Sequence, residues 1–191
     1  PSVVSYGLMS YKVTAIADNA FNGKLITSIK LPASIEKVGN QAFSWNDSLK
    51  NIVIEDGDNP ITFNDYSYAT FDNGKARYTV YSGRNIERIF RPSETPFPQA
   101  TTITWGPKVT VIGTGEGKSA FLTSAVISNS VKTIGASAFE GAGNSSNSTD
   151  LTITMSENVD SIGSSAFYNC RKLKDIYTSR SEERRVGKEC R

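Results

Sequence analysis

Residues 113–119 hold the glycines, lysine and serine that cradle phosphate in nucleotide-hydrolysing enzymes. The run is GTGEGKS, and it follows a short apolar segment. A phosphate loop has four residues between its first glycine and the Gly-Lys pair. Here three residues separate Gly113 from Gly117, and Ile112 stands where the first glycine belongs. The spacing therefore favours an inserted turn over a nucleotide site.

Histidine is absent from all 191 residues. Ser-His-Asp triads, Cys-His pairs and HExxH zinc sites all need its imidazole, so these sites are excluded. The acidic run Glu55–Asn59 lacks the alternating ligands and the distant glutamate of a calcium-binding EF-hand loop. A turn that ends a strand explains the same residues. We therefore expect no catalytic residues, no cofactor, no metal site and no enzymatic activity.

Exposed aromatic residues are the candidates for ligand binding, because such side chains anchor protein interfaces. Trp45 follows Phe43 in a predicted turn. The other candidates are tyrosines from the irregular middle of the chain: Tyr66, Tyr68, Tyr78 and Tyr81. Packing inside the protein is the alternative use of these rings.

Cys170 is the one cysteine before residue 180, and a single cysteine forms no internal disulfide. Two interpretations are open. The thiol is a small packed side chain, or it is a reactive group activated by Arg171 and Lys172. The direction of the side chains decides between them.

Residues 180–191 differ abruptly from the chain before them. The run RSEERRVGKECR has no apolar period and resembles the translation of a common sequencing adapter, so we expect a non-native tail. It carries five of the 21 basic and three of the 19 acidic residues, which leaves 16 of each and a net charge of zero. A basic, disordered tail that binds nucleic acid or membrane is the alternative. The remainder of the chain shows no clustered charge of the kind that nucleic acid requires.

A repeat of aliphatic residues, a glycine and an Ala-Phe pair runs through the chain, and it must position all of these residues. The clearest copies are Ile35–Phe43, Val131–Phe139 and Val159–Phe167; Val13–Phe21 has alanine in place of the glycine, and Val109–Phe121 carries four extra residues. We expect the glycine in a turn, where a positive φ costs it little.

Apolar residues at alternate positions precede each copy, which predicts a short strand with one buried face. The inward pairs are Ile29 and Leu31, Ile103 and Trp105, Ala125 and Ile127, and Ile153 and Met155. The residues between them are expected to face outward: Lys30, Thr104, Val126 and Thr154. Two decayed copies begin at Ile61 and Ile86, so that successive copies start 22 to 28 residues apart. Between the decayed and the regular copies, the three prolines of residues 91–98 predict an extended loop.

The segment Leu25–Phe43 resembles the consensus of the BspA-like leucine-rich repeats, and Asn169-Cys170 followed by Leu173 is similar to the continuation of that consensus. The resemblance implies a right-handed solenoid of short β-strands joined by tight or short helical turns. It also implies a bacterial cell-surface or secreted protein, and some members adhere to host matrix proteins.

The expected organisation is a single solenoid over residues 1–179. Residues 1–12 form an N-terminal hairpin cap, 13–54 regular repeats, 55–108 degenerate repeats with a loop, 109–179 regular repeats, and 180–191 the non-native tail. No apolar run approaches the roughly 20 residues that cross a bilayer. A signal peptide is missing at Pro1, which suggests a mature or internal fragment of metagenomic origin.

We therefore predict an extracellular or cell-surface binding module that recognises a protein or a glycan, including host matrix proteins. We expect a monomer that binds no nucleic acid and does not insert into membranes. The alternative is a structural spacer or scaffold without a ligand. Exposed aromatic residues on one face favour binding, whereas a uniform Ser/Thr/Lys surface favours the spacer.

Overall fold

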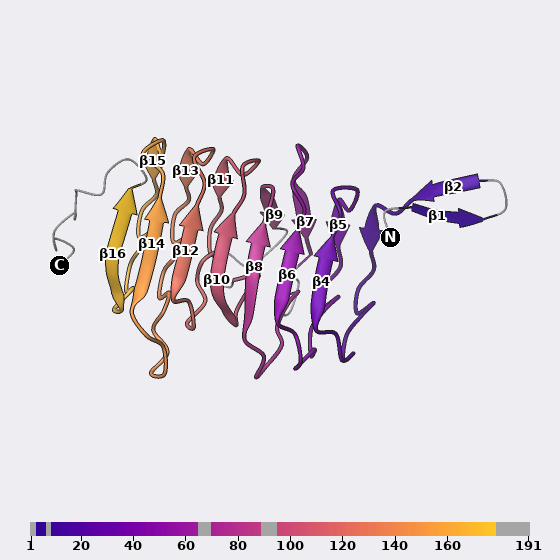
Figure 1. The fold of residues 1–191 in the computed structure, drawn as a ribbon, viewed down its shortest axis with the longest axis horizontal. Coiled ribbons are helices and arrows are strands. Elements are labelled where there is room, and N and C mark those ends of the chain that lie inside the picture. Colours follow the sequence, from indigo (N-terminus) through magenta and orange to yellow (C-terminus); the bar gives the residue numbers. More distant parts are fainter. Residues whose placement is uncertain (1–2, 7–8, 65–69, 89–94, 179–191) are drawn as a thin grey trace.

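The chain folds as a parallel β-solenoid of about seven turns (Figure 1). The structure is a computed structural model that describes residues 3–6, 9–64, 70–88 and 95–178. Each turn adds one strand to a seven-stranded parallel sheet. In chain order these strands are β4 (Ser28–Leu31), β6 (Asn51–Ile54), β8 (Tyr78–Ser82), β10 (Ala100–Trp105), β12 (Ser124–Ile127), β14 (Leu151–Met155) and β16 (Leu173–Thr178).

Short strands form the second side of each turn. Four of them make one parallel sheet: β3 (Ala15–Ile16), β5 (Lys37–Val38), β7 (Ile61–Phe63) and β9 (Ile86–Arg88). The other three make a second parallel sheet: β11 (Val111–Ile112), β13 (Thr133–Ile134) and β15 (Ser161–Ile162). The expected leucine-rich-repeat stack is confirmed, and the described turns contain no helix. No helix in these residues is long and apolar enough to span a membrane.

The Asn85 side chain joins the two short sheets. Its carbonyl oxygen accepts hydrogen bonds from the backbone N–H groups of Thr110 (2.8 Å) and Val111 (3.1 Å). Its amide donates to the Thr110 hydroxyl at 2.9 Å. A side chain thus replaces the backbone ladder where β9 gives way to β11.

The middle of the chain keeps the repeat register. Ile61 and Ile86, the starts assigned to the two decayed copies, are the first residues of β7 and β9. These strands continue the parallel pairing of β5. On the other side, β8 pairs with both β6 and β10. The stack is therefore continuous through residues 55–108, although residues 65–69 and 89–94 lie outside the described part.

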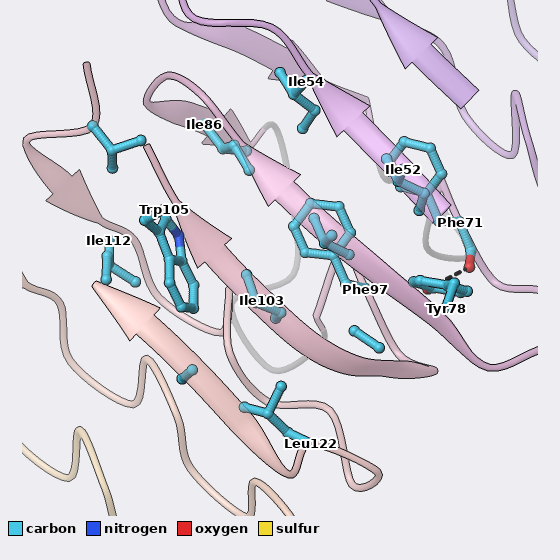
Figure 2. Packing of buried hydrophobic residues seen from close by; sticks show 14 of the residues in the cluster. Ile52, Ile54, Phe71, Tyr78, Ile86, Phe97, Ile103, Trp105, Ile112 and Leu122 are labelled. Carbon is cyan, nitrogen blue, oxygen red and sulfur yellow. Dashed lines mark hydrogen bonds between the residues drawn. The ribbon is translucent and has the colours of Figure 1, made fainter. Parts of the chain in front are cut away.

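A column of phenylalanine rings runs through the interior and links successive turns. Phe43 stacks on Phe71 at 5.5 Å between ring centroids, and Phe71 stacks on Phe97 at 5.6 Å. Further along, Trp105 meets Phe139 edge-on at 5.5 Å. Figure 2 shows Phe71, Phe97 and Trp105 packed among the inward isoleucines of the strands. Aromatic pairs at such distances add to the stabilisation from burial.

The repeat glycines serve close approach between turns, and our expectation of a positive φ at them is wrong. A Cβ on Gly39 would lie 2.3 Å from the Asp18 nitrogen, and one on Gly163 would lie 2.4 Å from the Ala136 nitrogen. The left-handed conformation falls two residues later, for example at Gln41 (φ 55°) and Ser165 (φ 57°). Backbone contact, which excludes any side chain, selects glycine here.

The N-terminal strands β1 (Val3–Tyr6) and β2 (Met9–Lys12) pair antiparallel as a hairpin. Figure 1 shows the hairpin extending away from the end of the stack. The first turn is hollowed by an apolar depression of about 390 Å³ that Val13, Ile16 and Phe21 help to line. That residues 1–12 cap the stack stays a prediction.

Candidate binding surface

The outward side chains of the seven-stranded sheet form straight rows, because the parallel strands pair in register. One row takes a residue from each strand: Lys30, Val53, Tyr81, Thr104, Val126, Thr154 and Tyr177. Neighbouring strands in a sheet lie about 4.8 Å apart. The row is thus a regular ladder of side chains along the length of the stack.

A second row lies two residues nearer the amino ends of the strands. It consists of Ser28, Asn51, Thr79, Thr102, Ser124, Thr152 and Asp175. Every side chain in this row carries a hydroxyl, an amide or a carboxyl group. Beside the mixed first row, it supplies evenly spaced hydrogen-bonding groups on the same face.

Tyr81 is held rigidly near the middle of the first row. Its hydroxyl donates to the Asp56 carboxylate at 2.7 Å. The ring crosses Gly106, where an added Cβ would come within 2.4 Å of the hydroxyl. Partial burial, and then the Asp56 carboxylate, raise the pKa of Tyr81 to about 12. A tyrosine fixed in this way loses little conformational entropy when it contacts a partner.

Ion pairs border the face at the carboxyl ends of the strands. Lys30 pairs with Glu55 at 2.8 Å, and Lys108 pairs with Asp58 at 2.7 Å. The hydrogen bond from Lys30 is the main cause of a lowered pKa for Glu55. The carboxylates of residues 55–59 therefore engage separate partners. Within the described ranges, no group of three or more His, Cys, Asp or Glu side chains is arranged to hold a metal ion.

The aromatic candidates do not form one patch. Trp45 is 60% exposed and lies in the turn before the amino end of β6, whereas the Tyr81 hydroxyl reaches the turn after the carboxyl end of that strand. Tyr66 and Tyr68 lie outside the described residues.

The suggestion that Tyr78 is exposed is wrong. Its side chain is 1% exposed, and its hydroxyl donates to the Phe71 carbonyl at 2.9 Å (Figure 2). The same hydroxyl accepts the Gln99 N–H at 3.4 Å. Tyr78 begins β8 on the inward face, where burial raises the pKa of its hydroxyl. Tyr78 is therefore a core residue and not part of the surface.

Residues 113–119 form an inward turn. The Glu116 carboxylate is buried and accepts hydrogen bonds from the Gly113 N–H at 2.6 Å and the Trp105 indole at 3.0 Å. Gly117 packs against the Phe139 ring, leaving no room for a Cβ. An acidic side chain directed into this loop is opposite to what a phosphate requires.

A buried amide ladder escaped the analysis of the sequence. Asn46 donates to the carbonyls of Phe21 (3.0 Å) and Phe43 (2.8 Å), and the Asn73 side chain accepts the Asn46 N–H at 2.7 Å. The Asn73 N–H in turn donates to the Gln99 side chain at 3.0 Å. The position of Asn46, three residues after the repeat phenylalanine, could have indicated a buried polar side chain.

Cys170 occupies the same position, three residues after its repeat phenylalanine, in the last described turn. Its thiol donates to the Phe139 carbonyl at 2.9 Å. Burial raises the pKa of the thiol, which disfavours the reactive thiolate. The geometry is that of a packed side chain.

Comparison with known proteins agrees with this geometry. The sequence profile of the family described as "BspA type Leucine rich repeat region" matches residues 14–146 and 110–190, in six copies. Repeats of this type are generally protein-interaction modules at surfaces, and their fold is typically a non-enzymatic scaffold. No match was found among curated proteins.

Two solved structures are similar to the chain. One is a leucine-rich cell surface protein from Faecalibacterium prausnitzii A2-165, at 23% identity and a TM-score of 0.56. The other is a leucine-rich repeat protein from Bacteroides ovatus ATCC 8483, at 20% identity and a TM-score of 0.31. Each match covers 93% of this chain, which spans 46% and 62% of the respective neighbours. With its repeats, stacked strands and matching profile, the chain belongs to the BspA-type leucine-rich repeat family.

Proposed function

We propose that the chain is a binding module at the cell surface or outside the cell, and that it recognises a protein ligand through the outward face of the seven-stranded sheet. The observation that carries this proposal is the continuous pair of side-chain rows across all seven strands. Host matrix proteins are the ligand class that the family resemblance favours. Most specific interfaces need about 800 Å² on each partner, which suits a long face of this kind better than a small pocket.

The apolar members of the first row supply the contact energy. Val126 is 37% exposed and Tyr177 is 46% exposed, and the rigid Tyr81 lies on the same row. Interfaces draw most of their energy from a few aromatic and apolar anchors surrounded by polar groups. The second row provides that polar surround. Trp45 contributes, on this proposal, only to a ligand that extends around the amino edge.

The short hydroxyl side chains of this face favour a second function, a spacer within a larger surface protein. Thr104 and Thr154 separate Tyr81, Val126 and Tyr177 in the first row. In the second row, five of the seven residues are Ser or Thr. A surface with few large side chains offers few anchors. Binding measurements decide between the two functions.

The test compares two exposed valines on different sheets. Val126 lies on the outward face of the seven-stranded sheet, whereas Val111 lies on the second side and is 41% exposed. Fibrinogen and fibronectin are immobilised, and binding of the protein and of its Val126→Glu and Val111→Glu variants is measured by surface plasmon resonance.

We expect saturable binding that Val126→Glu weakens at least tenfold, since a charge is placed in an apolar contact. Val111→Glu should bind like the parent. Equal loss in both variants contradicts the proposed face. No binding by a folded parent favours the spacer.

A further inference from the structure

An open hollow of about 380 Å³ lies at the amino ends of β8, β10, β12 and β14, apart from the outward rows. It is lined by side chains that precede or begin these strands: Arg77, Thr101, Phe121, Thr123, Asn147 and Ser148. The volume falls within the roughly 300–1,000 Å³ of small-ligand sites. One arginine, one aromatic ring and several hydroxyls make the lining chemically distinct from the sheet face.

Arg77 presents one edge of a fixed guanidinium group. Its Cζ atom lies over the Phe121 ring, 3.4 Å from the ring centroid. Nη1 donates to the carbonyls of Ala76 (2.8 Å) and Lys75 (3.3 Å). Within the described part of the chain, no group accepts a hydrogen bond from Nε or Nη2. This pair of donors has the spacing that binds a carboxylate in bidentate fashion.

The hydroxyls of the hollow are arranged as acceptors. Thr101 donates its hydroxyl hydrogen to the Tyr78 carbonyl (3.2 Å), and Thr123 donates to the Thr101 carbonyl (3.1 Å). Ser148 donates to the Ala120 carbonyl at 3.2 Å. Each hydroxyl has one hydrogen to give, so its remaining lone pairs accept hydrogen bonds. A ligand rich in O–H donors complements this arrangement.

The wall formed by residues 147–149, and the segment that leads into it, are held in place by hydrogen bonds within the chain. Lys172 donates from Nζ to the Ser145 carbonyl at 2.6 Å and also to the Ser148 carbonyl. The Ser145 N–H donates to the Ala120 carbonyl at 2.8 Å. These bonds hold the segment that makes the spacing between the last two copies the longest, 28 residues. A preformed wall lowers the entropy cost of binding.

We propose that this hollow binds an acidic sugar residue. The carboxylate of the sugar pairs with the Nε–Nη2 edge of Arg77, and its hydroxyls donate to Thr101, Thr123 and Ser148. A neutral sugar lacks the group that Arg77 requires, and a simple carboxylate lacks the donors that the hydroxyls require. The proposal stands independently of the protein ligand assigned to the sheet face.

The test measures binding of trigalacturonic acid to the full chain by isothermal titration calorimetry, with its fully methyl-esterified form as the neutral match. Arg77→Gln and Thr123→Val probe the two parts of the site. Arg171→Gln is the control, because Arg171 is exposed and does not line the hollow. Circular dichroism and thermal unfolding establish that every variant is folded.

We expect the acid to bind at least tenfold more tightly than its ester, and the affinity to fall as salt rises. Arg77→Gln should remove at least tenfold of the affinity, Thr123→Val should remove threefold or more, and Arg171→Gln should change nothing. Equal binding of acid and ester, or an unaffected Arg77→Gln variant, overturns the proposal. Displacement by acetate as effective as by galacturonate also overturns it, because the hydroxyl contacts would then contribute nothing.

Discussion

At the scale of the residue, the repeat places close backbone approach and the left-handed conformation at two different positions, although glycine can meet both requirements. Gly163 allows one turn to touch the next, whereas Ser165 adopts the left-handed conformation with φ 57°. Glycine therefore stands at this position because a Cβ has no room there. The left-handed position two residues later is Gln41, Ser137 or Ser165 in three copies, at a modest conformational cost, and a glycine (Gly115) in another.

This separation predicts opposite effects of two nearby substitutions. Gly163→Ala should destabilise the protein by about 1–3 kcal/mol, because the new Cβ overlaps the Ala136 backbone 2.4 Å away. Ser165→Gly should leave the free energy of unfolding unchanged or raise it by up to about 1 kcal/mol, since it relieves left-handed strain. Urea unfolding measures both. A more stable Gly163→Ala variant contradicts the assignment.

Tyr81 predicts a dependence of stability on alkaline pH. Its folded pKa of about 12 exceeds the ordinary value of 10.0, so folding favours the neutral hydroxyl. The resulting stabilisation is fully present below pH 10 and is lost as the pH rises toward 12. Tyr81→Phe should therefore lose less stability than the parent between pH 10 and 12, measured as the unfolding temperature. Tyr168→Phe, at an exposed position, should behave like the parent; identical profiles for all three proteins would contradict the prediction.

At the scale of the element, buried polar groups hold the corners of the solenoid. Arg84 is almost fully buried and donates to the carbonyls of Ala33 (2.9 Å), Pro32 (3.1 Å) and Ile35 (2.7 Å). These carbonyls belong to the corner after β4, two turns away along the stack. One side chain thus satisfies backbone acceptors that no strand pairs.

Arg84→Met should cost about 2–4 kcal/mol of unfolding free energy, because it removes the guanidinium donor from the Ala33 carbonyl and from the buried Ile35 carbonyl while keeping most of the side-chain volume. Arg171→Met is the control and should stay within about 0.5 kcal/mol of the parent, as exposed substitutions do. Chemical denaturation followed by tryptophan fluorescence measures both. Equal stability of the two variants would show that water satisfies these carbonyls.

The strands follow from the sequence, whereas the polar network does not. Alternating pairs such as Ile29 and Leu31 predict inward faces, because one buried side of a strand imposes a period of two. β8 is harder to predict, since buried Ser82 interrupts its apolar pattern. Arg84 meets carbonyls 49 to 52 residues earlier in the chain. Partners at such separations leave no local pattern, and the same reason concealed the hollow around Arg77.

At the scale of the whole molecule, strand pairing joins each turn to its immediate neighbours, so the stack approximates a one-dimensional array, to which Arg84 adds contacts that reach two turns away. The phenylalanine column is a principal link along this array. Phe71 touches Phe43, Phe63 and Phe97, whereas Phe21 lies at the first turn and, among the described residues, stacks on Phe43 alone. A substitution in the middle of the column should therefore let the two halves of the stack unfold separately. A substitution at the end should affect only the first turn.

Phe71→Ala should cost about 3–5 kcal/mol and split the unfolding transition, because it leaves a cavity between the two halves. Phe21→Ala should cost less than about 2 kcal/mol and leave one transition, because its ring is already partly exposed at the open end. Differential scanning calorimetry reports both the stability and the number of transitions. A single transition with equal loss in both variants contradicts the array description.

The measurement that tests the binding surface most directly is a charge scan of both sides of the stack. Thr104→Glu and Thr154→Glu place charges on the first outward row, and Thr133→Glu and Ser161→Glu place them on the second side. The affinity for fibrinogen and for fibronectin is measured for each folded variant. We predict at least a tenfold loss for both outward variants and no change for the two others. Loss confined to the second side, or unchanged affinity in all four, would contradict the outward face as the binding surface.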